Sequence, residues 1–229
     1  MSEALALAPR SLTWAERLFL RLLRWMEMKT FGFKHPFSEE LVRSSGFVGA
    51  LNFGKAVGKA MAGLEKRYGL LVSNLIMAFA GLWNGCRYCG VGHLYAANLL
   101  HFKATGRLYP IAEADVPWLQ ELSYEESMVR VRGMLSDEEF DEHLRIIERL
   151  YEIRGGAESK NEEDRLLALA LASWAWLNEC SAPITFDMQV KDVPAILEKG
   201  ERERLLDRYR AARDARSRRI AARAATAEG

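Results

Sequence analysis

The stretch LLVSNLIMAFAGLW (70–83), followed by NG (84–85) and CRYCGVGHLYAANLLHF (86–102), decides the fold. Its first part is a nearly unbroken apolar run, which predicts a buried helix and falls short of the ~20 residues that cross a bilayer. Asn84 and Gly85 interrupt the run. A second helix is expected from Cys86 to about Phe102, with Asn84 as its N-cap. The stretch therefore predicts two consecutive buried helices joined by a tight turn.

The sequence before this stretch also has helical patterns. Residues 12–28 form an amphipathic pattern that is expected to pack on the core or on a neighbouring subunit. Ser38 marks the start of a second helix that reaches about Gly46. The glycine-rich segment 47–66 is a weaker helix candidate, and it fits no phosphate-binding pattern.

The sequence after this stretch predicts several more helices. Residues 123–126 and 136–139 both have the spacing of a capping box. Gly155 and Gly156 are expected to end the second of these helices, and a long apolar helix follows from Ser159 or Asn161 to about residue 178. No run alternates like a strand, so the chain is expected to be all-α.

The composition is that of an ordinary globular protein. The chain has 229 residues, of which 49% are hydrophobic and 28% charged, and its formal net charge is +1. With so small a net charge, no nucleic-acid or membrane partner is expected. Arginines threaded through the first 24 residues break up any signal-peptide core, so a cytoplasmic location is expected.

An internal similarity suggests two related helical halves. Placing Cys180 under Cys86 aligns LNEC (177–180) with WNGC (83–86), each after a long apolar helix. Pro183 then falls at the Cys89 position and Asp187 at the His93 position, so the second copy is degenerate. Two independent helices with similar ends remain the alternative.

The domain expected is a single one over residues 1–229, with a helical extension at each end. The N-terminal extension, 1–30, is amphipathic, and the C-terminal extension, 201–229, is rich in arginine. Leu205, Leu206 and Tyr209 give the latter an apolar stripe among interleaved acids and arginines. A helix at the interface of a homo-oligomer is therefore expected there rather than a nucleic-acid or lipid site.

Cys86, Cys89 and His93 are the candidate catalytic residues. At i, i+3 and i+7 they lie within about 60° of one another on one helix face. A cysteine in the first turn of a helix is favoured as a thiolate, which lowers its pKa. Two thiols three residues apart can close a disulfide, and His93 can exchange protons near neutral pH. With three cysteines and no secretory signal, redox or metal chemistry is expected rather than structural disulfides.

The pattern Cys86-Arg87-Tyr88-Cys89, followed by His93 and preceded by a long apolar helix, resembles the alkylhydroperoxidase D and carboxymuconolactone decarboxylase superfamily. The resemblance implies an alkylhydroperoxidase D-like helical bundle, oligomerisation, and thiol peroxidase or disulfide-reductase activity. By position, Cys89 would attack a small hydroperoxide, Cys86 would resolve the sulfenic acid, and His93 would assist proton transfer. A dithiol reductant would then be needed, and no cofactor or metal is implied.

The sequence departs from the family at Asn74, where the proton relay of the family has a glutamate. An amide cannot act as a carboxylate base, so a slow peroxidase or a disulfide exchanger fits as well as a strong peroxidase. The order of attack stays open. The resemblance favours Cys89, whereas the helix-terminus argument favours Cys86.

The cluster has two other interpretations. Zinc could bind the same three residues, with a water or a side chain such as His101, Cys180 or a carboxylate as fourth ligand, and the three residues could instead be a non-catalytic core cluster. Decarboxylation does not call for two thiols. Surface, capping or packing roles are expected for His35, His101, His143, Cys180, Trp174 and Trp176.

Overall fold

The computed structural model describes residues 10–30, 34–181 and 199–227, and regular structure within them is helical, with no strand. The prediction of an all-α chain is confirmed. In chain order the elements are α1 (Trp14–Thr30), α2 (Ser38–Trp83), α3 (Arg87–Thr105), η1 (Glu113–Asp115), α4 (Val116–Glu121), α5 (Tyr124–Met134), η2 (Glu138–Phe140), α6 (Asp141–Arg154), α7 (Glu162–Ser181) and α8 (Lys199–Ala227).

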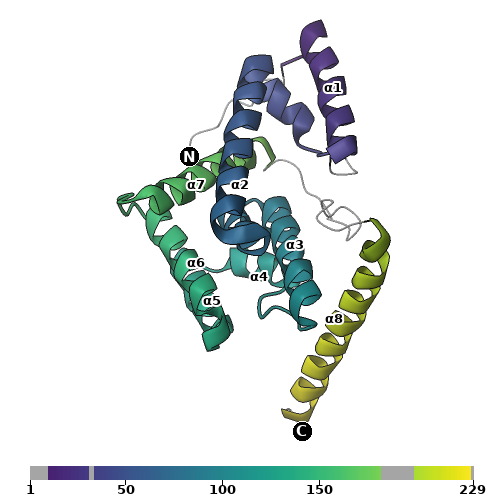
Figure 1. Ribbon diagram of the computed structural model, residues 1–229, viewed down its shortest axis with the longest axis vertical. Helices are drawn as coiled ribbons and strands as arrows, with labels where there is room; N and C mark the ends of the chain where they lie inside the picture. Colours follow the sequence, from purple (N-terminus) through teal and green to yellow (C-terminus); the bar gives the residue numbers. More distant parts are fainter. Residues whose placement is uncertain (1–9, 31–33, 182–198, 228–229) are drawn as a thin grey trace, which may run out of the picture.

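Helix α2 forms the centre of the core. It is bent at Gly46 (φ 69°) and at Gly69 (φ 75°), conformations that only glycine adopts without strain. The break expected near Gly46 is thus confirmed, as is the helix over 70–83. All residues from Ser73 to Trp83 are buried. Helix α2 packs against both α3 and α7 (Figure 1).

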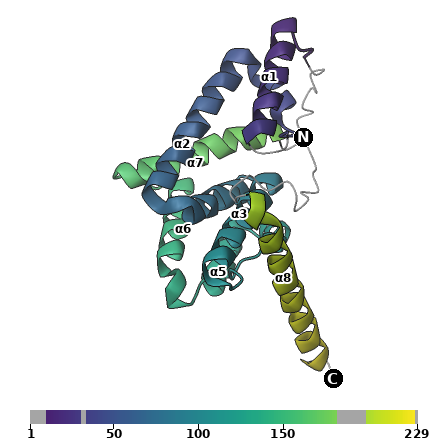
Figure 2. The same cartoon turned by 45° about the vertical axis from the view of Figure 1, so that its right-hand side comes forward.

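The helices form two groups along α2. Helix α1 lies beside the first part of α2 at one end of the molecule, while α3, α4, α5 and α6 gather around its other end (Figures 1 and 2). Helix α8 runs alongside α3 and extends away from the body. None of the helices in the described part of the chain is long and apolar enough to cross a membrane.

Most predicted helix ends are confirmed, and two are wrong, namely the capping box at 136–139 and the N-cap at Asn84 that is described with the site. Ser123 and Glu126 form the predicted capping box at the start of α5, and the Asn161 side chain accepts a hydrogen bond from the Asp164 amide at the start of α7. The box at 136–139 does not form. Residues 138–140 make a 3-10 turn instead, and α6 begins only at Asp141.

Helix α8 is attached to the body through its apolar stripe. Leu205, Leu206 and Tyr209 are buried in a cluster with Tyr95, Leu99 and Phe102 of α3. The side chains expected at a subunit interface are therefore covered by the chain itself. The Cys180 side chain, Pro183 and Asp187, on which the proposed internal repeat depends, lie outside the described residues.

Candidate active site

The turn between α2 and α3 places both cysteines. Helix α2 ends at Trp83, the Asn84 amide donates to the Ala80 carbonyl, and Gly85 adopts a φ of 81°. The chain then turns back, so that the Cys86 amide donates to the Gly81 carbonyl at 2.8 Å. This reversal puts the start of α3 directly against the last turn of α2.

The N-cap of α3 is Cys86, not Asn84 as predicted. The Asn84 side chain instead donates to the Leu171 carbonyl of α7. The Cys86 Sγ accepts the Cys89 amide N–H at 3.3 Å, in the way a capping side chain satisfies a free amide of the first turn. A backbone donor therefore points at the sulfur of Cys86.

The two sulfurs are in contact. Cys86 Sγ and Cys89 Sγ lie 2.6 Å apart, and both residues are free cysteines that are only 3% exposed. A disulfide bond is about 2.05 Å long, so closing one needs a shift of well under 1 Å and no rearrangement of the helix. The structure thus brings together the two thiols that the sequence singled out.

The two thiols differ in how well they hold negative charge. Contact with Cys86, together with burial, raises the pKa of the Cys89 thiol well above its ordinary value. Cys86 lies at the N-cap, where a backbone N–H and the helix dipole favour an anion. Of the two sulfurs, Cys86 therefore has the surroundings that better stabilise a thiolate, and its lowered pKa stays a prediction.

His93 is held by Asn74 of α2. Its Nδ1 lies 3.0 Å from Asn74 Oδ1, while Asn74 Nδ2 donates to the Leu70 carbonyl. Because the amide nitrogen is used by Leu70, the oxygen faces His93, so Nδ1 carries the proton and donates it. The other ring nitrogen, Nε2, is then the basic one.

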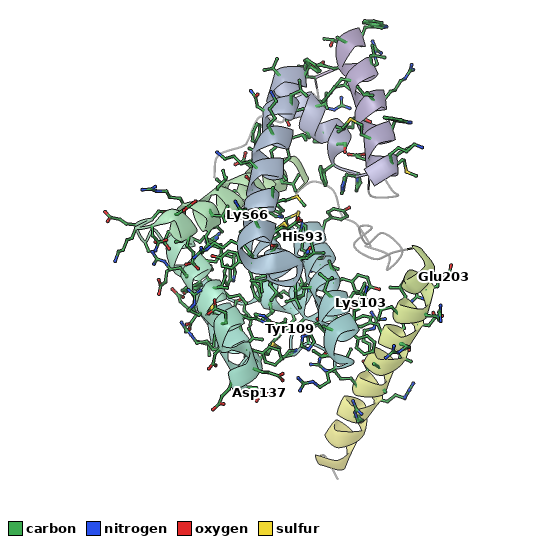
Figure 3. All side chains as sticks on the ribbon, in the orientation of Figure 1. Lys66, His93, Lys103, Tyr109, Asp137 and Glu203 are labelled. Carbon is green, nitrogen blue, oxygen red and sulfur yellow. The ribbon has the colours of Figure 1, made fainter. Side chains whose placement is uncertain are left out.

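The surroundings keep His93 neutral. Burial, with a smaller contribution from His35, lowers its pKa to about 4. Its ring lies 5.5 Å from that of Trp174 on α7, measured between centroids, and Figure 3 shows it in the middle of the molecule. A neutral imidazole at pH 7 can accept a proton from a thiol or return one to a leaving group.

His35 belongs to the site and does not have the surface or capping role expected from the sequence. Its Nδ1 lies 3.3 Å from the Tyr88 hydroxyl, and its ring stacks on Phe37. Burial lowers the pKa of His35 to about 4. No local pattern could have revealed this contact, because His35 precedes Tyr88 by 53 residues.

A carboxylate from α1 fixes the segment that carries His35. Glu27 is buried, accepts the Ser38 hydroxyl, and accepts the His35 amide N–H at 3.0 Å. Burial raises the pKa of Glu27. These two bonds fix the first residue of α2 and the backbone of His35 just before it. Glu27 therefore positions His35, and neither bond involves the imidazole.

Glycine permits the close approach of α2 and α3. A Cβ on Gly81 would lie 2.7 Å from Cys89 Cβ and 2.9 Å from the Gly90 amide nitrogen. Such distances are too short for real side chains, and the second involves backbone that cannot move aside. Cys89 can therefore occupy its position only if residue 81 has no side chain.

The other histidines lie away from the thiols. His101 is buried rather than on the surface, and it packs against the rings of Tyr109 and Phe140. His143 Nδ1 lies 3.1 Å from the Tyr109 hydroxyl. Within residues 10–30, 34–181 and 199–227, no group of three or more His, Cys, Asp or Glu side chains could hold a metal ion.

Trp174 and Trp176 occupy different environments. Trp176 packs edge-on against Phe53, which agrees with the expected packing role. Trp174 also packs in the core, but it does so against His93 and therefore forms one wall of the site.

The chain was also compared with known proteins. It matches no family model, and searches of curated proteins and of solved structures returned no match.

Proposed function

We propose that this protein is a thiol-based redox enzyme whose Cys86 and Cys89 cycle between a dithiol and a disulfide. The observation that carries the proposal is the 2.6 Å contact between the two sulfurs at the first turn of α3. It is supported by His93, a neutral imidazole on the same helix. The resemblance to the alkylhydroperoxidase D superfamily points to the same chemistry.

The first substrate class that we propose is a small hydroperoxide. A thiolate attacks the terminal peroxide oxygen, the O–O bond breaks, and the leaving alkoxide takes up a proton to become an alcohol. The sulfur becomes a sulfenic acid. The second thiol then attacks that sulfur, which forms the disulfide and releases water. An external dithiol returns the disulfide to two thiols and is itself oxidised.

The contacts favour Cys86 as the sulfur that attacks. Cys86 accepts a backbone N–H at the N-cap, whereas the pKa of Cys89 is raised. This order is the reverse of the one that the family resemblance implies. In either order, we propose that His93 passes the thiol proton to the leaving oxygen. Because its pKa is lowered to about 4, it gives up such a proton readily and does not hold it.

Disulfide exchange is the second candidate function, and Asn74 favours it. The Asn74 amide orients His93 but cannot itself carry a proton between groups. An incomplete proton relay slows a peroxidase more than a disulfide exchanger. The alkoxide that leaves in the peroxidase reaction must be protonated, whereas a thiolate leaves readily. In this reaction Cys86 attacks a substrate disulfide, which releases one substrate thiol and leaves a mixed disulfide. Cys89 then attacks the Cys86 sulfur, which releases the second substrate thiol and forms the Cys86–Cys89 disulfide.

The partners that we propose follow from this chemistry. They are a hydroperoxide or disulfide substrate and a dithiol reductant, with no bound cofactor. The cytoplasm, where thiol pools are kept reduced, is the compartment that we propose. A metal-binding or non-catalytic role for the same fold is the alternative that the experiment below separates from redox cycling.

The test is the intact mass of the reduced, metal-free protein before and after one equivalent of an organic hydroperoxide. The variants Cys86→Ser and Cys89→Ser are treated in parallel. We expect the wild type to lose two hydrogens, and the Cys89→Ser variant to gain one oxygen as a sulfenic acid that a dimedone probe traps. The Cys86→Ser variant should react much more slowly. The opposite pattern would assign the attack to Cys89.

The same reaction with a small disulfide in place of the hydroperoxide separates the two candidate functions. A fast loss of two hydrogens with the disulfide and a slow one with the hydroperoxide would identify an exchanger. If neither oxidant changed the mass over hours, the redox proposal would be wrong.

A further inference from the structure

We infer that the outer face of α1 binds a second copy of this chain in a two-fold symmetric dimer. The inference starts from the side chains that α1 presents to solvent. Six large apolar side chains on this helix are exposed, from 44% for Met28 to 75% for Trp14. They are Trp14, Leu18, Leu22, Trp25, Met26 and Met28.

The exposed face is not a consequence of a loosely attached helix. The opposite face of α1 is anchored to the chain by Leu20, Glu16 and Glu27, which are all buried. Glu16 accepts bonds from Arg10 and Thr13, and Glu27 from Ser38 and the His35 amide. Most of the apolar residues of this amphipathic helix therefore point away from the core. Of the two roles expected for it, packing on a neighbouring subunit is the one that its orientation favours.

The apolar surface continues onto α2. Phe47 packs edge-on against Phe19 of α1 with ring centroids 4.7 Å apart, and Phe47, Val48 and Leu51 are themselves exposed. Nine of the twelve exposed large apolar side chains among the described residues lie on α1 or within 47–51. Scattered exposed apolar residues are normal, whereas such a concentration marks an interaction site.

The size of this face suits a dimer. At roughly 100 Å² for a half-exposed large side chain, nine of them offer about the ~800 Å² per partner that a stable interface buries. The enrichment in Trp, Phe and Met is also typical of interface centres.

The charges around the face are self-complementary. Arg17, Arg21 and Lys29 are exposed along α1. Glu39 and Glu40, at the start of α2, pair within the chain with Arg24 and Arg43, and 41% and 40% of their side chains stay exposed. In two copies related by a two-fold axis, the exposed cations of one can face the exposed part of these acids of the other. A uniformly anionic partner, such as an acidic membrane, would be attracted by the cations around this face but repelled by its acids. The other apolar stripe, on α8, is already covered by α3.

The test is the solution mass by light scattering during size-exclusion chromatography of the full chain. The variants are Leu18→Glu/Leu22→Glu, on the proposed face, and Val129→Glu, an equally exposed residue on α5. We expect the wild type and Val129→Glu to have about twice the 26.0 kDa of one chain. The double variant should fall to a smaller species, with dissociation at least about tenfold more favourable. Circular dichroism confirms that its helix content is unchanged.

Two results would overturn the inference. One is a wild type that is monomeric at the concentrations where the variants are compared. The other is a double variant with the mass of the wild type. If that variant kept its mass but lost co-flotation with phosphatidylserine-containing vesicles, the face would bind lipid and not a second copy. None of these outcomes depends on the redox proposal.

Discussion

His93 donates its Nδ1 proton to Asn74 Oδ1 across 3.0 Å, and the orientation of the amide is fixed by a second bond from Asn74 to the Leu70 carbonyl. A neutral amide therefore holds the histidine. It fixes the tautomer and adds no charge. In this protein Asn74 is a positioning residue.

Replacing Asn74 tests this role. In Asn74→Ala the imidazole loses its acceptor, and we expect the rate of oxidation of the thiols to fall about tenfold to a hundredfold. In Asn74→Asp the acceptor stays and a negative charge is added, which should raise the pKa of His93 from about 4. NMR titration of the imidazole and the rate of disulfide formation measure the two effects. Equal rates in all three proteins would remove Asn74 from the mechanism.

The two buried histidines make stability depend on pH. The pKa of both His35 and His93 is lowered from 6.5 to about 4. Between these values the unfolded chain binds protons that the folded chain does not, so the free energy of unfolding falls as the pH drops from 6.5 towards 4. The contribution of the two histidines to the free energy of unfolding is fully retained above pH 6.5. Urea unfolding across this range should show the decline.

The variant His35→Gln provides the control for this pH dependence. It removes one of the two titrating groups, so the decline should become shallower. The pKa of His93 should also rise, because the neighbouring imidazole that disfavours its protonation is gone. A pH profile identical to that of the wild type would show that His35 does not titrate as described.

Gly81→Ala should disturb the site, whereas Gly133→Ala should not. The new Cβ at residue 81 meets Cys89 and the Gly90 backbone, and overpacking of this kind costs about 1–3 kcal/mol. Residue 133 has open space and lies within α5, so alanine there should stabilise by about 0.5–1 kcal/mol. Thermal unfolding and the rate of thiol alkylation report both effects. A Gly81→Ala protein with unchanged stability and thiol reactivity would contradict the packing described.

Glu113 should be the main anchor of α8. It accepts bonds from Tyr209 at 2.7 Å, Arg213 at 2.8 Å and Asn98 at 3.1 Å. Glu113→Ala leaves these donors without their acceptor and should cost about 2–3 kcal/mol. Asp207→Ala, at an exposed ion pair, should change stability by less than about 0.5 kcal/mol.

Limited proteolysis locates the effect of the Glu113 substitution. Cleavage within 199–227 should become faster in Glu113→Ala and stay unchanged in Asp207→Ala. If α8 were equally protected in both variants, the anchor would lie elsewhere, for example in the apolar contacts of Leu205 and Leu206.

The helices were predictable where the cause is local. The apolar run 70–83, the glycines at 46 and 85, and the caps at Ser123 and Asn161 all act within a few residues. The capping box at 136–139 failed because a 3-10 turn at 138–140 precedes α6, and tertiary packing buries Phe140 in that turn. Tertiary packing overrides the local preference of a short capping pattern more easily than that of a long apolar run.

The part of the site that lies at the start of and along α3 could be predicted from the sequence. The contact of Cys86 with Cys89 follows from their spacing on one helix, as does the placement of His93 on α3. The contributions of His35 and Trp174 come from distant segments and leave no trace in a local pattern. The raised pKa of Cys89 could not be predicted from the sequence either, because it depends on which sulfur caps the helix and on burial.

Equilibration of the protein with mixtures of dithiol and disulfide reports directly on whether Cys86 and Cys89 form a redox pair. The protein is held at a series of ratios of oxidised to reduced dithiothreitol, quenched in acid and alkylated, and peptide mass spectrometry measures the fraction in which both Cys86 and Cys89 are alkylated, with Cys180 as an internal reference. We predict a single two-electron transition between a form alkylated at both residues and a Cys86–Cys89 disulfide, and no such transition in Cys86→Ser. Alkylation of Cys86 and Cys89 to the same extent at every ratio would contradict the redox pairing.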